Sequence, residues 1–521
     1  MQPSRTAVDP QTPVKEDVNF VESTESGIPS TYADIAASRL SKAHRDYLLE
    51  RHGTLELDPM PSMDPADPYN WPSWKKIVNL LLVAFHACMG TFAAAGIIPA
   101  YETISTEYGV SINDASYMTS IQIAVLGVAP LIWKPLSNRW GRRPVFLLSL
   151  ICSLICNIGC AESTSYSSLA VCRALQAFFI SPASDAEAIG SAVVMETTFK
   201  KDRARYMGIW TLLVTLGIPS GPFIFGFVTY RIGYQWIYWI LAIIQFRIDQ
   251  INGGQFILYL FFGPETRYVG GDYDTSKPAW VREYVQLRRI DPTPLSPWDF
   301  IRPLGMFTHP CVAIPAAAYA MIFCLSNVMT TVEVPALLQT KFDLNAEQLG
   351  LQFLGPIVGS LIGEQLGGVL SDRWMRLREK KTHRKPQPEH RLWLSYIGFL
   401  CSIVGLVVFL VCTEQSKEGH WNIRPVIGIA ICAAGNQIVT TVLITYAVDC
   451  YHTEAASVGV FITFVRQIWG FLGPFWFPSM FEHVGVAASA GVCAALIIGV
   501  SFIPIALVHW QGRSWRPATG E

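Results

Sequence analysis

Three ionisable side chains lie within long apolar stretches of this chain. Arg173, Glu364 and His86 each have mostly apolar neighbours over the length of a helix. A charge at the centre of a bilayer costs about 2.5–3.5 kcal/mol on insertion scales, so such residues are functional candidates. A carboxyl group in apolar surroundings can hold and release a proton, and histidine titrates near neutral pH. These residue types suit proton transfer or the binding of a polar ligand.

Each of these residues also has a simpler interpretation. Arg173 lies about one turn inside an apolar stretch and could extend to the membrane interface. Glu364 could be the buried partner of a basic residue such as Arg466. His86 could form a single structural hydrogen bond. The sequence leaves these alternatives open.

Polar amides and one more arginine occur in other apolar stretches. Amides can orient a substrate without adding net charge, or they can join two helices by hydrogen bonds. We treat these residues as candidates for substrate binding or proton coupling: Asn327, Asn436, Gln437 and Arg466.

The stretches that hold these residues have the length of membrane spans. The chain has 521 residues, of which 51% are hydrophobic and only 15% are charged. A soluble protein would carry about 25% charged residues. An apolar segment of about 20 residues crosses a hydrocarbon core of roughly 30 Å. We predict an all-α integral membrane protein with twelve transmembrane helices, at 77–98, 113–133, 145–161, 167–198, 207–228, 235–262, 311–331, 347–370, 392–412, 425–447, 458–480 and 486–509.

The distribution of basic residues predicts how these spans are oriented. If the N-terminus lies inside the cell, the inside segments carry 32 Lys and Arg residues and the outside loops carry 4. Cytosolic segments of membrane proteins are enriched in Lys and Arg. We therefore predict that both termini and the basic 371–391 loop are cytosolic.

The chain divides into a tail, two halves and a central connection. Residues 1–76 are polar and lack the apolar core of a signal peptide, so we expect a disordered cytosolic tail. Residues 77–263 and 310–509 would each hold six helices, with a central cytosolic loop at 264–309 and a C-terminal tail at 510–521. Residues 136–140 and 370–374 repeat the pattern Leu-Ser-Asn/Asp-Arg-Trp after the second span of each half. Two related helical halves are typical of secondary transporters.

Two of the predicted spans are interrupted by polar residues. Asp185 and Glu187 lie in the fourth span, and Arg247 and Asp249 lie in the sixth. Our preferred hypothesis is that 184–187 and 245–251 belong to short insertions, because removing a few residues would restore ordinary span lengths. The alternative is a pair of broken helices that line a site.

Four groups of residues resemble the motifs of one transporter family. The segment 134–144 is similar to Gly-x-x-x-Asp-Arg-x-Gly-Arg-Arg, and Arg173-Ala-Leu-Gln-Ala177 is close to Arg-x-x-Gln-Gly. The segment 217–226 is close to Gly-x-x-x-Gly-Pro-x-x-Gly-Gly, and Asn70-Trp71-Pro72 and Pro264-Glu-Thr-Arg267 flank the first half. Over residues 64–515 the chain resembles the major facilitator superfamily, and within it the fungal twelve-span drug:proton antiporters.

The resemblance implies roles for two sets of residues. The first is a gating loop and its counterpart in the second half, namely Asn138, Arg139, Gly141, Arg142, Arg143, Asp372 and Arg373. The second is the antiporter motif of span 5, namely Gly217, Pro219, Gly221, Pro222 and Gly226. In the family, this motif packs helices closely and is associated with efflux. The resemblance also places spans 1, 4, 7 and 10 around a central cavity.

The chain departs from these motifs at several positions. Lys134 and Asn138 stand where the family has Gly and Asp, and Ala177 and Phe225 replace glycines. In the family, the loop aspartate faces a helix N-terminus and steadies the outward-open state. Asn138 could still accept a backbone hydrogen bond there. It lacks a negative charge that is worth about 0.3–1 kcal/mol near a helix dipole.

From these features we expect a proton-coupled exporter of a small organic compound, such as a toxin, drug or fungal secondary metabolite. Uptake of a polyamine or other nutrient is the first alternative, and a non-transporting membrane sensor or an inactive chain is the second. No nucleotide-binding loop and no metal-binding motif occur, so no cofactor and no metal are expected. The expected partners are the substrate, protons and the lipid bilayer, without nucleic acid. A monomer in the cell membrane is expected.

Overall fold

The computed structural model describes residues 40–55, 57–184, 190–246, 255–268, 278–285, 289–382, 387–451 and 454–516. Within these ranges the secondary structure is helical and no strand occurs. The chain forms two compact units, Met1–Met60 and Pro61–Glu521. The first unit contains one described helix, α2 (Lys42–His52), which begins at the capping side chain of Ser41 and ends at Gly53 in a left-handed conformation.

Part of the predicted tail, 1–76, is helical in the structure. Besides α2, the tail contains the short helix η1 (Pro68–Asn70), in which the side chain of Asp67 accepts a hydrogen bond from Tyr69. Asn70 is buried and donates to the carbonyl of Ser62 at 2.7 Å. Trp71 is buried, and its indole donates to Glu283 at 3.0 Å. The Trp71–Glu283 contact joins residues 212 positions apart, so composition alone does not reveal it.

The N-terminal half consists of helices that match the first six predicted spans. It contains α3 (Ser73–Ala95), η2 (Ile98–Ala100), α4 (Tyr101–Tyr108), α5 (Ile112–Trp140), α6 (Arg142–Ala161), α7 (Tyr166–Ser184), α8 (Gly190–Thr197), α9 (Lys200–Ile232), α10 (Gln235–Phe246) and α11 (Gln255–Phe262). The central connection contains α12 (Ala279–Tyr284), α13 (Pro297–Ile301) and η3 (Arg302–Thr308).

The C-terminal half repeats this organisation with more irregular helices. The seventh span runs through α14 (Pro310–Ile322), η4 (Phe323–Met329), α15 (Thr330–Val332), η5 (Pro335–Gln339) and α16 (Thr340–Phe342). The eighth runs through α17 (Ala346–Gln352), α18 (Leu354–Gln365), η6 (Leu366–Leu370) and α19 (Ser371–Thr382). The remaining elements are η7 (Pro388–Leu392), α20 (Trp393–Gln415), α21 (Arg424–Cys450), α22 (Ala455–Val484), α23 (Val486–Leu496), η9 (Ile497–Phe502) and α24 (Ile503–Trp515). The elements η4, η5, η6 and η9 are π-helical.

Ten helices in the described ranges are long and apolar enough to cross a membrane. The other two predicted spans, 167–198 and 235–262, each correspond to two shorter helices, α7 with α8 and α10 with α11. The residues between these pairs, 185–189 and 247–254, lie outside the described residues. The insertion hypothesis concerns Asp185, Glu187, Arg247 and Asp249, so it also falls outside them.

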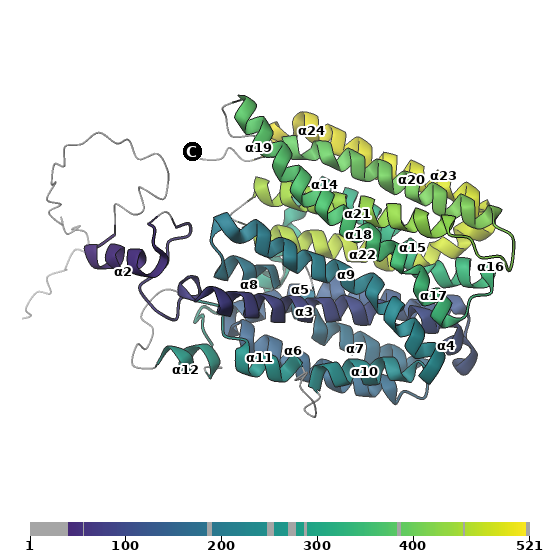
Figure 1. Ribbon diagram of the computed structural model, residues 1–521, viewed down its shortest axis with the longest axis horizontal. Coiled ribbons are helices and arrows are strands. Elements are labelled where there is room, and N and C mark those ends of the chain that lie inside the picture. Colours follow the sequence, from purple (N-terminus) through teal and green to yellow (C-terminus); the bar gives the residue numbers. More distant parts are fainter. Residues whose placement is uncertain are drawn as a thin grey trace, which may run out of the picture. The chain divides into compact units, whose positions relative to one another are not determined.

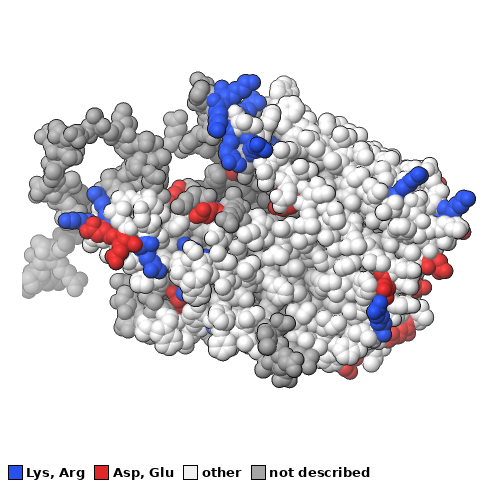
Figure 2. Space-filling view, viewed as in Figure 1, with Lys and Arg blue, Asp and Glu red and all other residues white. Residues whose placement is uncertain are grey.

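The predicted 371–391 loop is helical over much of its length. Helix α19 continues the eighth span to Thr382 because its Arg, Leu, Glu, Lys and Met residues favour a helix. We call the end of the second unit where α3 begins and α24 ends the tail end, and the opposite end, near α4 and α16, the far end. Figure 1 shows the long helices running between these two ends. The visible face in Figure 2 is almost uncharged across its middle, and charged side chains gather toward its two ends.

Candidate functional site

A small cavity of about 50 Å³ lies between the two halves, near the middle of the helices. A volume of this size holds a few water molecules. A larger solute therefore requires the halves to move apart. The described residues that line it are apolar, hydroxyl or amide residues, and none of them is ionisable: Thr91, Ala94, Ala95, Ile98, Thr119, Ile123, Leu126, Ile218, Phe323, Asn327, Val328, Thr331, Val332 and Gln467.

Two amides from the C-terminal half reach this cavity. Asn327 lies in the π-helical segment η4, which is a type of irregularity that is frequent at functional sites. Gln467 comes from α22, and its buried Oε1 atom has no hydrogen-bond partner in the described structure. An unsatisfied buried acceptor costs about 1–3 kcal/mol. The Gln467 carbonyl is therefore available to a donor on a bound solute.

Contacts between the halves close the far end. Arg231 of α9 pairs with Glu347 of α17 at 3.1 Å. The ring of Tyr117 on α5 stacks on Phe475 of α22 with centroids 4.6 Å apart. Gln339 of η5 donates a hydrogen bond to Glu102 of α4. These three links lie on different helix pairs, so the cavity is covered on the far side.

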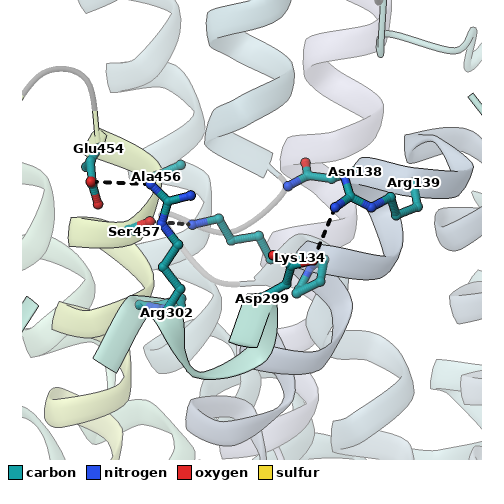
Figure 3. Close-up of a pocket in the computed structure, with 10 residues that line it drawn as sticks. Lys134, Asn138, Arg139, Asp299, Arg302, Glu454, Ala456 and Ser457 are labelled. Carbon is teal, nitrogen blue, oxygen red and sulfur yellow. Dashed lines mark hydrogen bonds and ion pairs between the residues drawn. The ribbon is translucent and has the colours of Figure 1, made fainter. Parts of the chain in front are cut away.

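At the tail end, a polar cavity of about 300 Å³ separates α5 from the start of α22 (Figure 3). Lys134 reaches across it, and its Nζ atom donates to the Ser457 hydroxyl at 3.3 Å. On the opposite wall, Arg302 pairs with Glu454 at 3.4 Å. Asn138 lines the same cavity but makes no hydrogen bond to the described part of α22. Among the described residues, Lys134 makes the contact with α22, and the gating role of Asn138 stays a prediction.

The gating loop turns at Gly141 and is held there by Glu265. Gly141 has a φ of 99°, and a Cβ atom at this position would overlap the Glu265 carboxylate. That carboxylate accepts the backbone N–H groups of Arg142 at 2.8 Å and Arg143 at 3.0 Å. Burial raises the pKa of Glu265, and its hydrogen bonds from backbone N–H groups oppose that rise. Glu265 thus caps the N-terminus of α6 from the central connection.

The loop arginines have specific partners within the N-terminal half and the central connection. Arg143 donates to the carbonyls of Tyr259 at 2.9 Å and Leu260 at 2.7 Å, which caps the end of α11. Arg142 pairs with Glu196 at 2.9 Å. Arg139 pairs with Asp291 at 2.6 Å and Asp299 at 3.1 Å. Hydrogen bonds from Thr293 lower the pKa of Asp291, and Arg139 lowers it further.

The corresponding segment of the C-terminal half is held differently. The Ser371 hydroxyl accepts a hydrogen bond from Arg391 at 3.2 Å, and Arg391 pairs with Asp449 at 3.4 Å. Arg373 is exposed. The side chain of Asp372 lies outside the described residues, so its predicted gating role stays a prediction.

Arg173 lies inside the N-terminal half rather than on the cavity wall. Its side chain is fully buried. It donates to the Gln122 side chain at 2.6 Å, the Tyr238 hydroxyl at 3.0 Å and the Ala94 carbonyl at 3.1 Å. The alternative that Arg173 extends to the membrane interface is therefore wrong. No carboxylate of the described residues lies within ion-pair distance of it.

Glu364 and Arg466 do not form the pair that we considered. The half-buried Glu364 carboxylate accepts a hydrogen bond from Gln437 of α21. Arg466 donates to the Tyr319 hydroxyl at 3.2 Å and lies 4.7 Å from the centre of the Phe323 ring. Glu364 and Gln437 therefore meet each other, while Arg466 packs against the seventh span.

Asn436 and His86 lie in helix contacts. Asn436 is buried beside Gln437 on α21. His86 is fully buried, and its Nε2 atom lies 3.1 Å from the Ser149 hydroxyl, which itself donates to the Phe179 carbonyl. Because the Ser149 hydroxyl already donates its hydrogen, its oxygen accepts a hydrogen bond from the Nε2–H group of His86. The simpler interpretation of His86 as a structural hydrogen bonder agrees with this geometry.

The glycines of the antiporter motif lie where helices touch most closely. Cβ atoms at Gly217 and Gly221 would meet backbone atoms of α3, and one at Gly226 would meet the backbone of α17. Pro219 and Pro222 lie within α9. The close packing that we predicted for this motif is present.

One departure from the motif is compensated by a glycine on the neighbouring segment. The Phe225 ring occupies the space beside Gly96, and its centroid lies 4.9 Å from that of Phe92. A side chain at Gly96 would overlap the Phe225 ring. The bulk added at Phe225 is thus accommodated by the small residue opposite it.

A further acid in the seventh span was not among the predicted residues. Glu333 has only 3% of its surface exposed, and its side chain has no hydrogen-bond or ion-pair partner among the described residues. The predicted span ended at residue 331, which placed Glu333 in a loop. The sequence Val332-Glu333-Val334-Pro335 does contain a signal for a buried acid. Glu333 lies between two valines, and a proline follows two positions later.

Comparisons with known proteins agree with this architecture. A family model described as the Major Facilitator Superfamily matches residues 80–474. An uncharacterized transporter of Schizosaccharomyces pombe is 24% identical, and the alignment covers 87% of this chain and 91% of that protein. The efflux pump radE of Floropilus chiversii is 25% identical, with 86% and 83% covered. A crystal structure of the peptide transporter POT in complex with alafosfalin superposes with a TM-score of 0.60 at 16% identity, covering 87% of this chain and 98% of that one.

Proposed function

Because the chain belongs to the Major Facilitator Superfamily, we propose that it exports a small organic compound from the cytosol in exchange for protons. The transporter works by alternating access in the cell membrane. Its tail end, with both termini, faces the cytosol. One chain suffices, because the two halves together enclose the cavity.

The observation that carries this proposal is the position of the cavity. It lies between the two halves, and both halves supply its lining. The far end is closed by contacts such as Arg231 with Glu347, which join the halves without covalent links. Separating the halves at one end and closing them at the other would expose the cavity to each side in turn.

The lining favours a neutral solute with a mostly apolar body. Asn327 and Gln467 supply the amides, and none of the described lining residues is charged. A polyamine would bring several positive charges into a space that no described carboxylate lines, which is costly away from water. The cavity therefore favours a neutral toxin or secondary metabolite over a polyamine.

Two further features support export over uptake. The close packing of Gly217, Gly221 and Gly226 belongs to the motif that is associated with efflux in the antiporter branch that this chain resembles. One relative with similar coverage is named an efflux pump. Uptake, and a sensor or inactive chain, are the outcomes that an experiment must separate from export.

The test is compound accumulation in a yeast strain that lacks its own drug exporters. Cells with the full chain should accumulate less labelled cycloheximide, a neutral amphiphile, than cells with an empty vector. Spermidine and glucose levels should be unchanged, and a protonophore should remove the difference. Higher accumulation of any of the three would replace export with uptake. Unchanged accumulation across a panel of neutral amphiphiles would favour the sensor or inactive chain.

The orientation has a separate test. Residue 382 ends α19 at the tail end. A cysteine introduced at Thr382 should be resistant to an impermeant maleimide in intact cells and should react after permeabilisation. The native chain, which carries 12 cysteines, is the control for background labelling. Efficient labelling of Thr382→Cys in sealed cells would reverse the proposed orientation.

A further inference from the structure

In the seventh span, an acidic residue follows directly after the uncharged residues that line the cavity. Thr331 and Val332 line the cavity, and Glu333 follows them toward the far end. The Glu333 side chain is buried, and no described residue donates a hydrogen bond to its carboxylate. Glu333 follows Val332 of the cavity and precedes Gln339 of the far-end contacts, so it lies between the two along the seventh span.

The helix is interrupted at this residue. Helix α15 ends at Val332, and π-helical segments lie on both sides, η4 before it and η5 after it. Pro335 contributes to the break because it has no N–H group for the preceding turn. Interrupted helices at membrane depth are tolerated mainly where they line a site or a cavity. The break places Glu333 at a point where the span can bend.

The groups around Glu333 offer it no positive partner in the described structure. Tyr101 of α4 lies within electrostatic range of both Glu333 and Arg173. The Tyr101 hydroxyl donates to Thr119 at 2.6 Å. Arg173 is engaged by Gln122 and Tyr238, and Glu102 is engaged by Gln339. Tyr238 of α10 also lies within electrostatic range of Tyr101. The elements that pack against η5 carry Lys341 on α16 and Glu347 on α17, and these pair with Glu418 and Arg231.

This arrangement has a thermodynamic consequence. Burying an ionised carboxylate without a partner costs several kcal/mol. Protonation removes that cost, and so does opening the far end to water. Closing the far end therefore favours the protonated form of Glu333, and ionised Glu333 favours the open form. Glu364 is less constrained, because it is only half-buried and accepts a hydrogen bond from Gln437.

We propose that Glu333 carries the coupling proton and that its protonation is what allows the far end to close. A proton taken up from outside would then be delivered to the cytosol when the far end is closed and the tail end opens. This inference rests on the proposed function, since it names the residue that links protons to alternating access. It replaces Glu364, the residue that sequence alone favoured for this role.

The test is hydrogen exchange of the full chain in lipid nanodiscs at about pH 5.5, 7 and 8.5, corrected for the intrinsic exchange rate. Exchange in far-end segments, 101–117 and 471–485, should increase with pH. A single coupled proton changes the ratio of open to closed forms by at most about tenfold per pH unit. In Glu333→Gln, which cannot ionise, exchange in these segments should stay low and independent of pH.

Two variants make the test specific. Glu364→Gln, the matched acid of the same half, should keep the wild-type response. Glu333→Asp keeps an acid and should respond to pH with a shifted midpoint, which also provides a result if the Gln variant does not fold. A full wild-type response in Glu333→Gln, or an unchanged midpoint in Glu333→Asp, would overturn the assignment. If the wild-type chain exports compounds but the variants give either of these overturning results, the inference about Glu333 is wrong and the proposed function stands.

Discussion

The two copies of the Leu-Ser-Asn/Asp-Arg-Trp repeat are held by the same kind of contact but to different degrees. In the first copy the Ser137 hydroxyl accepts from Arg142, and Arg142 pairs with Glu196 at 2.9 Å. In the second, Ser371 accepts from Arg391, which pairs with Asp449 at 3.4 Å. The Arg142 side chain is 4% exposed and that of Arg391 is 16% exposed.

The difference shows which property the repeat preserves. Arg142 follows its serine by 5 positions, whereas Arg391 follows its serine by 20. The arginine therefore keeps its place in space and not its place in the sequence. The first copy turns at once into α6, while the second continues as α19 to Thr382. We infer that the N-terminal half is the more rigid of the two at the tail end.

The fifth span of each half gives a second comparison. Both contain a Gly-Pro pair, Gly221-Pro222 in α9 and Gly473-Pro474 in α22. A Cβ atom at Gly221 would meet the backbone of α3, with the Phe92 carbonyl 2.5 Å away. A Cβ atom at Gly473 would meet side chains, those of Phe477 and Cys324. Side chains can rotate away, but a helix backbone can move only as a whole.

The largest effect should follow from this second comparison. Gly221→Leu should abolish transport and destabilise the fold by more than about 4 kcal/mol, because the clash is with backbone. Gly473→Leu should retain measurable transport. Compound accumulation and thermal unfolding of the purified protein would measure both. Gly208→Leu is the control on α9, since a Cβ atom there has no neighbour within 4 Å. Equal loss in Gly221→Leu and Gly473→Leu would remove the distinction between the two spans.

The next effect separates the two arginines. Arg142→Ala should cost about 3 kcal/mol, because it leaves the Glu196 charge partly buried without its nearest partner. Arg391→Ala should cost about 1 kcal/mol, since its ion pair is longer and more exposed. Thermal unfolding in the same detergent gives both values. If Arg391→Ala proved the more damaging, the inferred rigidity of the N-terminal half would be wrong.

A smaller effect is expected at the turn that the first copy makes. Gly141→Ala should destabilise by about 1–3 kcal/mol, since it strains a positive φ and pushes Glu265 away. Gly368→Ala, beside the second copy, should be neutral because a Cβ atom there meets nothing within 4 Å. The unfolding temperatures of the two variants, each compared with that of the native protein, measure this difference in stability. If alanine were tolerated at both positions, Glu265 would not hold the turn at Gly141 as described.

The smallest effect concerns the residue that differs between the copies, Asn138 in one and Asp372 in the other. Asn138→Asp adds a negative charge close to Lys134 and the N-terminus of α22. This should stabilise the closed tail end by about 0.3–1 kcal/mol and raise the far-end-open population about two- to fivefold. Hydrogen exchange of 101–117 at constant pH measures it. An unchanged or decreased exchange would show that the loop does not act on the far end.

The sequence was sufficient where a property is local. Apolar runs and basic connections predicted the long helices, and the glycine spacing of 217–226 predicted the close contacts of α9. The family resemblance placed span 7 at a central cavity, and Asn327 of that span lines the cavity between the halves. The apolar runs and the glycine spacing depend on neighbours within a turn or two, which hydropathy and spacing record directly.

The sequence was insufficient where a side chain depends on a distant partner. Arg173 bonds to Gln122 51 positions away, and Trp71 bonds to Glu283 212 positions away. No sequence pattern near Arg173 or Trp71 predicts these contacts. Glu333 was missed for another reason, namely that the π-helical segment η5 and helix α16 continue the seventh span beyond its apolar run. Hydropathy locates the apolar run, but it does not show where the helix ends.

The cap that Glu265 places on α6 also sets an order of events during synthesis. Its carboxylate bonds to amides 122 and 123 positions earlier in the chain. A ribosome that has completed α6 has therefore not yet made the residue that fixes its first turn. The start of α6 must wait, with its amide groups at the membrane surface, until α11 has been inserted and the chain continues past it. The first half is thus finished by a residue that lies beyond its last helix.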